Sequence, residues 1–380
     1  MGQRLPLTAS PTIRAAAPAL AGVLLLTALV AIAYGGGRLL NYDSAYSLLW
    51  GSQLSRGHIP DITVPYAPTQ HPLTTILGAL LTLPGTGPTP SYTTAIATWE
   101  LLSLLALGTL GWLTYALGKA WFGTAAGIAA AAIILTREPV MSFGIRAYLD
   151  IPYLCLILAA LLTETRKPRN ATPVLILLGL AGLLRPEAWL FSLAYLAYLK
   201  HHQQLRPAHL AYAAAAPLIW AATDLIQTGN PIYSFTETQE AAANLGRITG
   251  ITNVPENLPR RLGEILREPG LIAAAGGGLL TLLLLKDRAR LAIASGLAAI
   301  AAFTILATTG LPILTRYLLL PATILTIFAA AGLLGWTQLP KHHPWRTRWI
   351  GFAALCTALF LITTPSQLDR LKSTNRALAA

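Results

Sequence analysis

Residues 41–72 read NYDSAYSLLWGSQLSRGHIPDITVPYAPTQHP, a polar, aromatic and proline-rich stretch that lies between long apolar runs. It contains two aspartates and two histidines, which are Asp43, Asp61, His58 and His71. Ionisable side chains at the edge of a membrane are costly to keep there unless the protein uses them. The stretch is therefore a candidate for chemistry at a membrane surface.

The composition of the whole chain indicates a membrane protein. Of the 380 residues, 54% are hydrophobic and 11% are charged, and the mean hydropathy is +0.57. A soluble domain carries roughly a quarter charged residues. The net charge of +12 is compatible with a nucleic-acid binder, but the basic residues punctuate apolar runs as cytoplasmic loops do. We therefore predict a polytopic membrane protein, and its high alanine content favours a bacterial origin.

Eleven apolar runs predict an all-α fold with about eleven transmembrane helices. The first run, 15–33, follows Arg4 and Arg14 as in a signal peptide, but it is long and has no clear cleavage site, which favours a retained span. The other predicted spans are approximately 93–117, 121–136, 149–163, 172–184, 187–199, 208–226, 270–285, 290–308, 318–335 and 348–363.

The first outer loop, residues 34–92, is predicted to carry interfacial or re-entrant helices. One of them falls within 44–55, and its apolar face would carry Ala45, Leu48, Leu49 and Ser52. The following apolar piece, 73–83, is about half of the roughly 20 residues that cross a bilayer. We expect this piece to lie on the surface or to re-enter without crossing.

Charge distribution decides between the two topologies. If 73–83 does not cross, the N-terminal tail and five basic connectors share the cytoplasmic side, with 14 of the 27 Lys and Arg residues against two acids. If it crosses, those connectors face outward, against the positive-inside rule. We therefore predict a single plasma-membrane domain, 1–363, with a cytoplasmic N-terminus and a short, fraying outer tail at 364–380.

The polar loops then gather at the outer face. The longest, 227–269, has a helix-forming part at 236–247 and an amphipathic part at 257–270. We interpret it as a lid or an acceptor-binding element, with a purely structural cover as the alternative. Its candidate functional side chains are Glu237, Glu240 and Arg247.

Four sequence features carry a resemblance to a known class of enzymes. They are the first-loop Asp43, the His-Pro pair at 71–72, the Arg146-x-x-x-Asp150 element and the RYLLLP run at 316–321. Together with the order of spans, they resemble the GT-C class of integral-membrane glycosyltransferases. Within that class, the chain is similar to the protein O-mannosyltransferase and aminoarabinose-transferase superfamily. The resemblance implies transfer of a hexose or pentose from a polyprenyl-phosphate donor at the outer face.

The same resemblance assigns roles to the polar residues. Asp43 matches the first-loop aspartate and would act as general base. Asp150 would be a second acid or would orient Arg146, because both share a helical face if the helix starts before Arg146. The side chains expected to bind the donor phosphate or sugar are Arg146, Arg185, Arg316 and His71, since guanidinium groups bind phosphate well.

Each role has a plainer alternative. Asp43 could cap a helix that begins at Ser44. Arg146 and Asp150 could form a structural ion pair. Arg185 and Arg316 could snorkel to lipid headgroups.

Cofactors and partners follow from the same reasoning. The histidine pairs of the cytoplasmic connectors lack acidic neighbours, and Cys155 and Cys356 fall inside apolar runs, so no metal site is predicted. A divalent cation, Mg²⁺ or Mn²⁺, is the one cofactor that the resemblance leaves open. The expected partners are the polyprenyl-phosphate sugar, membrane lipid and a protein, lipid or glycan acceptor, and no nucleic acid.

Two other classes of function remain open from the sequence. A transporter or flippase would favour internal repeats and interrupted spans with polar residues near the midplane. A catalytically inactive scaffold would keep the fold without needing the carboxylate of Asp43.

Overall fold

The computed structural model describes residues 11–34, 39–64, 67–83 and 92–379. Arg4 of the predicted basic tail and parts of the first outer loop lie outside these residues. The described chain contains helices and no strand, so the predicted all-α fold is confirmed.

The helices fall into an N-terminal and a C-terminal half. The first half comprises α1 (Pro11–Tyr34), α2 (Tyr42–Ser55), α3 (Pro72–Leu81), α4 (Tyr92–Phe122), α5 (Thr124–Ile134), α6 (Glu138–Ile145), α7 (Asp150–Arg166), α8 (Ala171–Gly182) and α9 (Glu187–His201). The second half comprises α10 (Pro207–Thr228), α11 (Tyr233–Asn244), η1 (Ile251–Asn253), α12 (Val254–Leu284), α13 (Lys286–Thr308), η2 (Thr315–Leu318), α14 (Leu319–Leu334), η3 (Gly335–Gln338) and α15 (Pro344–Ala379).

Every predicted span coincides with a helix or part of one. Among the described residues, six helices are long and apolar enough to cross a membrane, or seven if α5 and α6, bent by 65°, form one broken span. The remaining predicted spans are shorter or more polar helices, such as α8 and α9. The chain is therefore a multi-pass membrane protein built from long and short helices.

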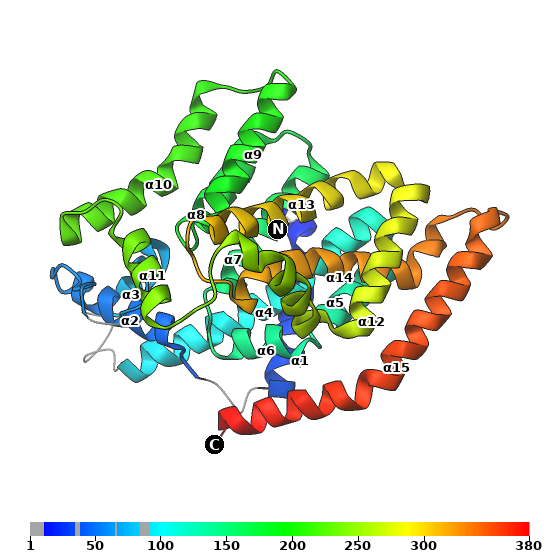
Figure 1. Cartoon of the computed structure of the whole chain (residues 1–380), viewed down its shortest axis with the longest axis horizontal. Helices are drawn as coiled ribbons and strands as arrows, with labels where there is room; N and C mark the ends of the chain where they lie inside the picture. Colours follow the sequence, from blue (N-terminus) through cyan, green and yellow to red (C-terminus); the bar gives the residue numbers. More distant parts are fainter. Residues whose placement is uncertain (1–10, 35–38, 65–66, 84–91, 380) are drawn as a thin grey trace, which may run out of the picture.

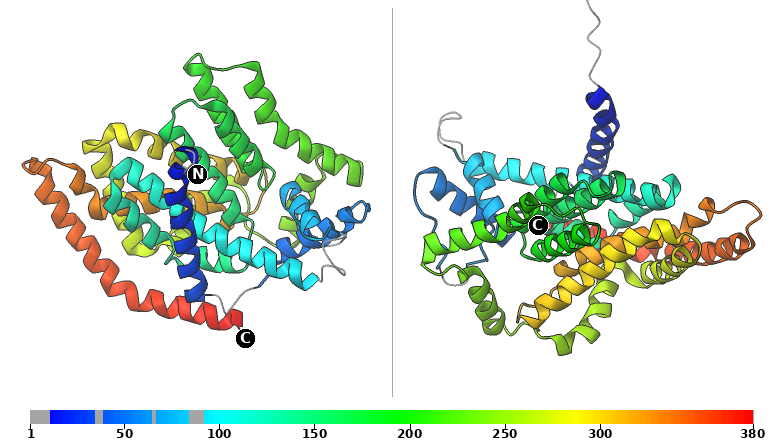
Figure 2. Two further views of the ribbon diagram at one scale, coloured as in Figure 1. Left: turned by 180° about the vertical axis from the view of Figure 1, so that it is seen from behind. Right: turned by 90° about the horizontal axis from the view of Figure 1, so that it is seen from above.

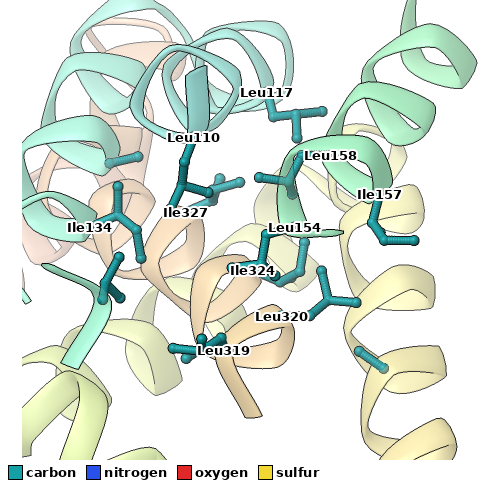
Figure 3. Packing of buried hydrophobic residues seen from close by; sticks show 14 of the residues in the cluster. Leu110, Leu117, Ile134, Leu154, Ile157, Leu158, Leu319, Leu320, Ile324 and Ile327 are labelled. Carbon is teal, nitrogen blue, oxygen red and sulfur yellow. The ribbon is translucent and has the colours of Figure 1, made fainter. Parts of the chain in front are cut away.

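Helix α14 occupies the centre of the molecule, with α4, α5, α7, α12 and α13 around it (Figure 1). Figure 3 shows the apolar core where α14 packs against α4, α5 and α7. The side chains labelled there are Leu110, Leu117, Ile134, Leu154, Ile157, Leu158, Leu319, Leu320, Ile324 and Ile327.

Small residues allow α12 and α14 to pack backbone against backbone. A Cβ atom added at Gly277 would lie 2.1 Å from the carbonyl oxygen of Phe328, and one at Gly332 would lie 2.5 Å from that of Ala273. Small residues four apart are a common means of close helix packing within membranes, where lipid offers no hydrophobic driving force.

Helices α1 and α15 lie at the periphery. Helix α1 extends away from the body of the molecule in the view from above, and α15 follows one edge (Figure 2). The tail predicted to fray at 364–380 instead continues α15 to Ala379. Glu138 of α6 explains this difference, because it accepts a hydrogen bond from Thr374 at 2.9 Å and pairs with Arg370 at 3.8 Å.

The first outer loop forms two short helices, α2 and α3, that pack against each other. Helix α2 exposes Ala45 and Leu49 of its predicted apolar face and buries Leu48 and Ser52. Its buried residues are Ser44, Ser47, Leu48, Trp50, Gly51 and Ser52. The reason is close approach: a Cβ at Gly51 would lie 2.3 Å from the backbone nitrogen of Ala79.

The long loop contains α11 and the first half of α12. Residues 254–266 form the predicted amphipathic helix, which buries Leu262, Ile265 and Leu266. The helix breaks at Arg267, whose φ is 62°. At this break, the buried guanidinium of Arg137 donates to the Leu266 carbonyl at 3.3 Å.

Candidate functional site

A cavity of about 670 Å³ lies between the first outer loop, the starts of α7 and α9, and the segments α10, α11 and η2. Its walls are mostly apolar and aromatic, with Trp189, Trp220 and Phe235 among the lining residues. Seven of the nine predicted site residues line it, namely Asp43, His71, Asp150, Arg185, Glu237, Arg247 and Arg316. A concave apolar pocket with a few converging polar groups is the usual form of a ligand site.

Helix α2 presents Asp43 from its first turn. Asn41 caps this helix, with its Oδ1 accepting from the Ser44 nitrogen at 3.0 Å. Asp43 is therefore not the cap that the alternative interpretation required. The Asn41 nitrogen donates to the Arg146 carbonyl at 2.9 Å, which ties α2 to the turn before α7.

Asp43 forms an ion pair with Arg316, whose segment is 273 residues away in the chain. Arg316 Nη1 lies 2.8 Å from Asp43 Oδ2, and the two side chains are 21% and 15% exposed. Burial alone raises the pKa of Asp43, but the positive charge of Arg316, with smaller effects of His71 and Arg185, outweighs it. The pKa is therefore lowered, and the carboxylate is charged at neutral pH.

Arg185 is held by two carboxylates. Its Nη1 donates to Asp150, and its Nε and Nη2 donate to Glu187 Oε1 at 3.1 and 2.8 Å. All three residues are buried, with Asp150 at 3%, Arg185 at 7% and Glu187 at 8% exposure. Arg185 was predicted from the sequence as a donor-binding residue, but Glu187 was not predicted as part of the site. An acid two residues after an arginine, at the start of a helix, was the available signal.

Tyrosine rings separate the arginines of the site. The guanidinium carbon of Arg185 lies 4.3 Å from the ring centre of Tyr317, and that of Arg316 lies 5.5 Å from it. Arg316 also lies 5.7 Å from the ring of Tyr148, which Arg146 approaches at 5.3 Å. Cation–π contact with a ring stabilises a buried guanidinium without neutralising its charge.

Arg146 departs from its predicted geometry. Helix α6 ends at Ile145, and α7 begins only at Asp150, so Arg146 and Asp150 are not on one helix. The positive φ of Ala147, 57°, turns the chain between them. Asp150 pairs with Arg185 instead, and Arg146 does not line the cavity.

His71 stands at the start of α3, immediately before Pro72. Its ring meets Trp220 edge-on, with 5.9 Å between ring centres. Burial lowers the pKa of His71 to about 4, although the nearby charge of Asp43 opposes this shift. The imidazole is thus neutral at pH 7, and its Nδ1 has no hydrogen-bond partner among the described residues.

Helix α11 lies beside α2 and α3 of the first outer loop (Figure 1), and several of its residues line the cavity. The buried carboxylate of Asp224 accepts hydrogen bonds from the nitrogen and hydroxyl of Ser234, at 2.9 and 2.7 Å, and so fixes the start of α11. Thr238 contacts Thr69 of the first loop at 2.7 Å. Glu240 does not line the cavity. Asp224 lines it and was missed by the sequence analysis, since an acid inside an apolar span has no visible partner.

The acids of the cavity wall are paired with arginines. Asp43, Asp150 and Glu187 each accept a hydrogen bond from a guanidinium. Within the described ranges, no group of three or more His, Cys, Asp or Glu side chains is arranged to hold a metal ion by itself.

Comparison with solved structures identifies the architecture. No family model matches the sequence, and no curated protein does. The crystal structure of ArnT from Cupriavidus metallidurans bound to undecaprenyl phosphate matches with a TM-score of 0.52 at 13% identity, covering 97% of this chain and 74% of that one. The apo form of the same protein matches with a TM-score of 0.47 at 16% identity.

The chain shares the fold of this ArnT structure, which is a GT-C-like membrane fold. The fold that the four sequence features implied is thus confirmed. In this GT-C-like fold, the first-loop Asp43 and the RYLLLP segment lie on one cavity, which explains how features so distant in sequence form one pattern.

Proposed function

We propose that this protein is a glycosyltransferase that moves a sugar from a polyprenyl-phosphate donor to an acceptor at the outer face of the plasma membrane. The observation that carries the proposal is the Asp43–Arg316 pair on the wall of a large, mainly apolar cavity. A carboxylate and a guanidinium side by side supply the base and the phosphate ligand that the reaction needs.

The proposed reaction is a single displacement. The acceptor hydroxyl oxygen forms a bond to the anomeric carbon while the bond from that carbon to the phosphate oxygen breaks. The phosphate leaves with the electron pair, and the hydroxyl proton passes to Asp43. Attack from the side opposite the phosphate inverts the anomeric centre.

Electrostatics favour this division of roles. Asp43 is charged at neutral pH because of Arg316, and so it is able to accept a proton. Arg316 is placed to stabilise the charge that develops on the departing phosphate. The neutral imidazole of His71 adds no charge, and its Nδ1, which has no partner among the described residues, is available to accept a hydrogen bond from a sugar hydroxyl.

The aromatic walls support a lipid-linked substrate. Trp189 and Trp220 pack edge-to-face with 5.8 Å between ring centres, and both line the cavity with Phe235 and Ile232. Aromatic surfaces accommodate both sugar rings and isoprenoid chains. Glu237 and Arg247 line the same cavity and are proposed to contact the acceptor.

Sugar transfer from labelled polyprenyl-phosphate hexoses and pentoses tests the proposal. Membranes that contain the wild type, Asp43→Asn or Asp61→Asn would be compared at equal protein level. We expect Asp43→Asn to lower transfer by about 10²-fold or more, as loss of a general base does. Asp61→Asn is the matched control, because Asp61 lies in the same loop, is exposed and does not line the cavity.

The outcomes separate the classes of function. Transfer that survives Asp43→Asn would keep the enzyme but remove Asp43 from its role. Donor binding without transfer would indicate that the acceptor is missing from the membranes. Absence of both binding and transfer would favour a transporter, a flippase or an inactive scaffold.

A further inference from the structure

The two arginines on the cavity wall are held in different ways. Arg185 uses three N–H groups on protein carboxylates, two on Glu187 and one on Asp150. Arg316 uses one N–H group, on Asp43, and its Nε has no partner among the described residues. A guanidinium has five N–H donors, so Arg316 retains more capacity for a new ligand.

Local charge makes the same distinction. Arg185 pairs with two carboxylates, so its positive charge is more fully compensated by direct ion pairs than that of Arg316. Arg316 forms a direct ion pair with one carboxylate, that of Asp43, while the charge of Asp150 acts on it without a direct ion pair. Arg185 is also more deeply buried, with a side chain 9% exposed against 21% for Arg316.

The ring of Tyr317 lies near both cations. The centre of the ring lies 4.3 Å from the guanidinium carbon of Arg185 and 5.5 Å from that of Arg316. The face of the Arg316 guanidinium is directed to this ring, and its N–H groups point outward from the edge. Arg316 can therefore exchange the carboxylate of Asp43 for a phosphate while its guanidinium stays on the ring.

Resting on the proposed function, we propose that the donor phosphate takes Arg316 away from Asp43, so that the base becomes free only when donor is bound. Arg185 keeps its two carboxylates and acts as a positioning residue through Tyr317. The exchange keeps Arg316 paired and leaves Asp43 without its cation, which raises the pKa of Asp43 and makes the carboxylate a stronger base. It also imposes an order, with donor binding before proton transfer from the acceptor.

Binding of undecaprenyl phosphate to the full-length protein in detergent tests this exchange without requiring turnover. In the wild type, the lipid phosphate competes with Asp43 for Arg316. Asp43→Asn weakens that competitor, so we expect binding about tenfold tighter, the size expected for a hydrogen bond to a charged group. Asp61→Asn removes the same charge from the same loop and is expected to leave the dissociation constant unchanged.

A double-mutant cycle with Arg316→Gln isolates the pair. Arg316→Gln alone is expected to weaken lipid binding. In that background, Asp43→Asn should give no tightening, because the contested cation is gone. Asp43→Ser replaces Asp43→Asn if the asparagine variant does not elute as a folded monodisperse species.

Each result decides something distinct. Equal or weaker binding by the Asp43 variant would overturn the exchange while leaving the proposed function intact. Tightening that persists with Arg316→Gln would also overturn it, because Asp43 would then act through its charge alone. Failure of the wild type to bind undecaprenyl phosphate would overturn the proposed function and the exchange together.

Discussion

Glu187 shows how one side chain positions the charge on the cavity wall. In a buried site, it accepts hydrogen bonds from two N–H groups of Arg185, and Asp150 accepts one from a third. Removing one partner of a buried pair leaves an uncompensated charge, which costs more than an exposed pair is worth. The residue therefore bears on stability as well as on the site.

Glu187→Gln is expected to lower the free energy of unfolding by about 1–3 kcal/mol, because a hydrogen-bond acceptor remains but its charge does not. The control is Glu268→Gln, which changes a carboxylate that is 76% exposed and 3.9 Å from Arg267. Exposed substitutions of this kind usually stay within about 0.5 kcal/mol. Thermal unfolding of both variants in the same detergent checks the prediction, and equal midpoints would contradict it.

The acidic limb of the pH profile of kcat/KM, which reports the protein without bound donor, is expected to depend on Arg316. Arg316 is the main group that lowers the pKa of Asp43, while burial alone raises it. Since the base acts in its charged form, a lowered pKa keeps the enzyme active to lower pH. Arg316→Gln should raise the Asp43 pKa and move the acidic limb to higher pH. His71 and Arg185 remain near Asp43 in the variant and limit the size of the shift. An acidic limb that does not move at all would contradict the role of Arg316.

At the scale of elements, the contact between α12 and α14 depends on residues that lack side chains. Gly277 and Gly332 allow the two backbones to meet at the centre of the fold. Helix α14 continues directly from η2, which carries Arg316 and Tyr317. The packing of α14 therefore determines where the RYLLLP segment presents its arginine.

Gly277→Ala is expected to destabilise the protein by about 1–3 kcal/mol, as overpacking does. The added methyl would lie 2.1 Å from the Phe328 carbonyl oxygen. Gly351→Ala in α15 is the matched control, since nothing lies within 4 Å of its Cβ position. There the better helix propensity of alanine should leave stability unchanged or slightly higher. Unfolding midpoints that fall equally in both variants would contradict the close-packing account.

At the scale of the whole molecule, the charge pattern predicts which ends of the helices face the cytoplasm. The connector at 200–206 is predicted inside, and the loop at 227–269 with its cavity is predicted outside. Both segments have exposed positions, Gln204 and Glu256, that are suitable for labelling.

Single-cysteine labelling in intact cells checks this orientation, with Cys155 and Cys356 replaced by alanine. A membrane-impermeant maleimide should react with Glu256→Cys in intact cells and with Gln204→Cys only after permeabilisation. The reverse pattern would place the cavity on the cytoplasmic side and contradict the proposed outer-face reaction.

The sequence by itself determined the class of fold and the positions of its helices. Apolar runs, short interfacial segments and basic connectors are local properties of the chain, and each predicted span corresponds to a helix in the structure. The resemblance also pointed to Asp43 and to Arg316, which the structure brings together.

Only the tertiary structure decided which side chains meet. Asp43 contacts Arg316 from 273 residues away, Glu187 joins Arg185, and Arg146 stays outside the cavity. The buried face of α2 also differs from its apolar stripe, because Gly51 packs against α3. The physical reason is that helix rotation follows from close packing between small residues, and a local pattern of hydrophobicity does not specify that packing.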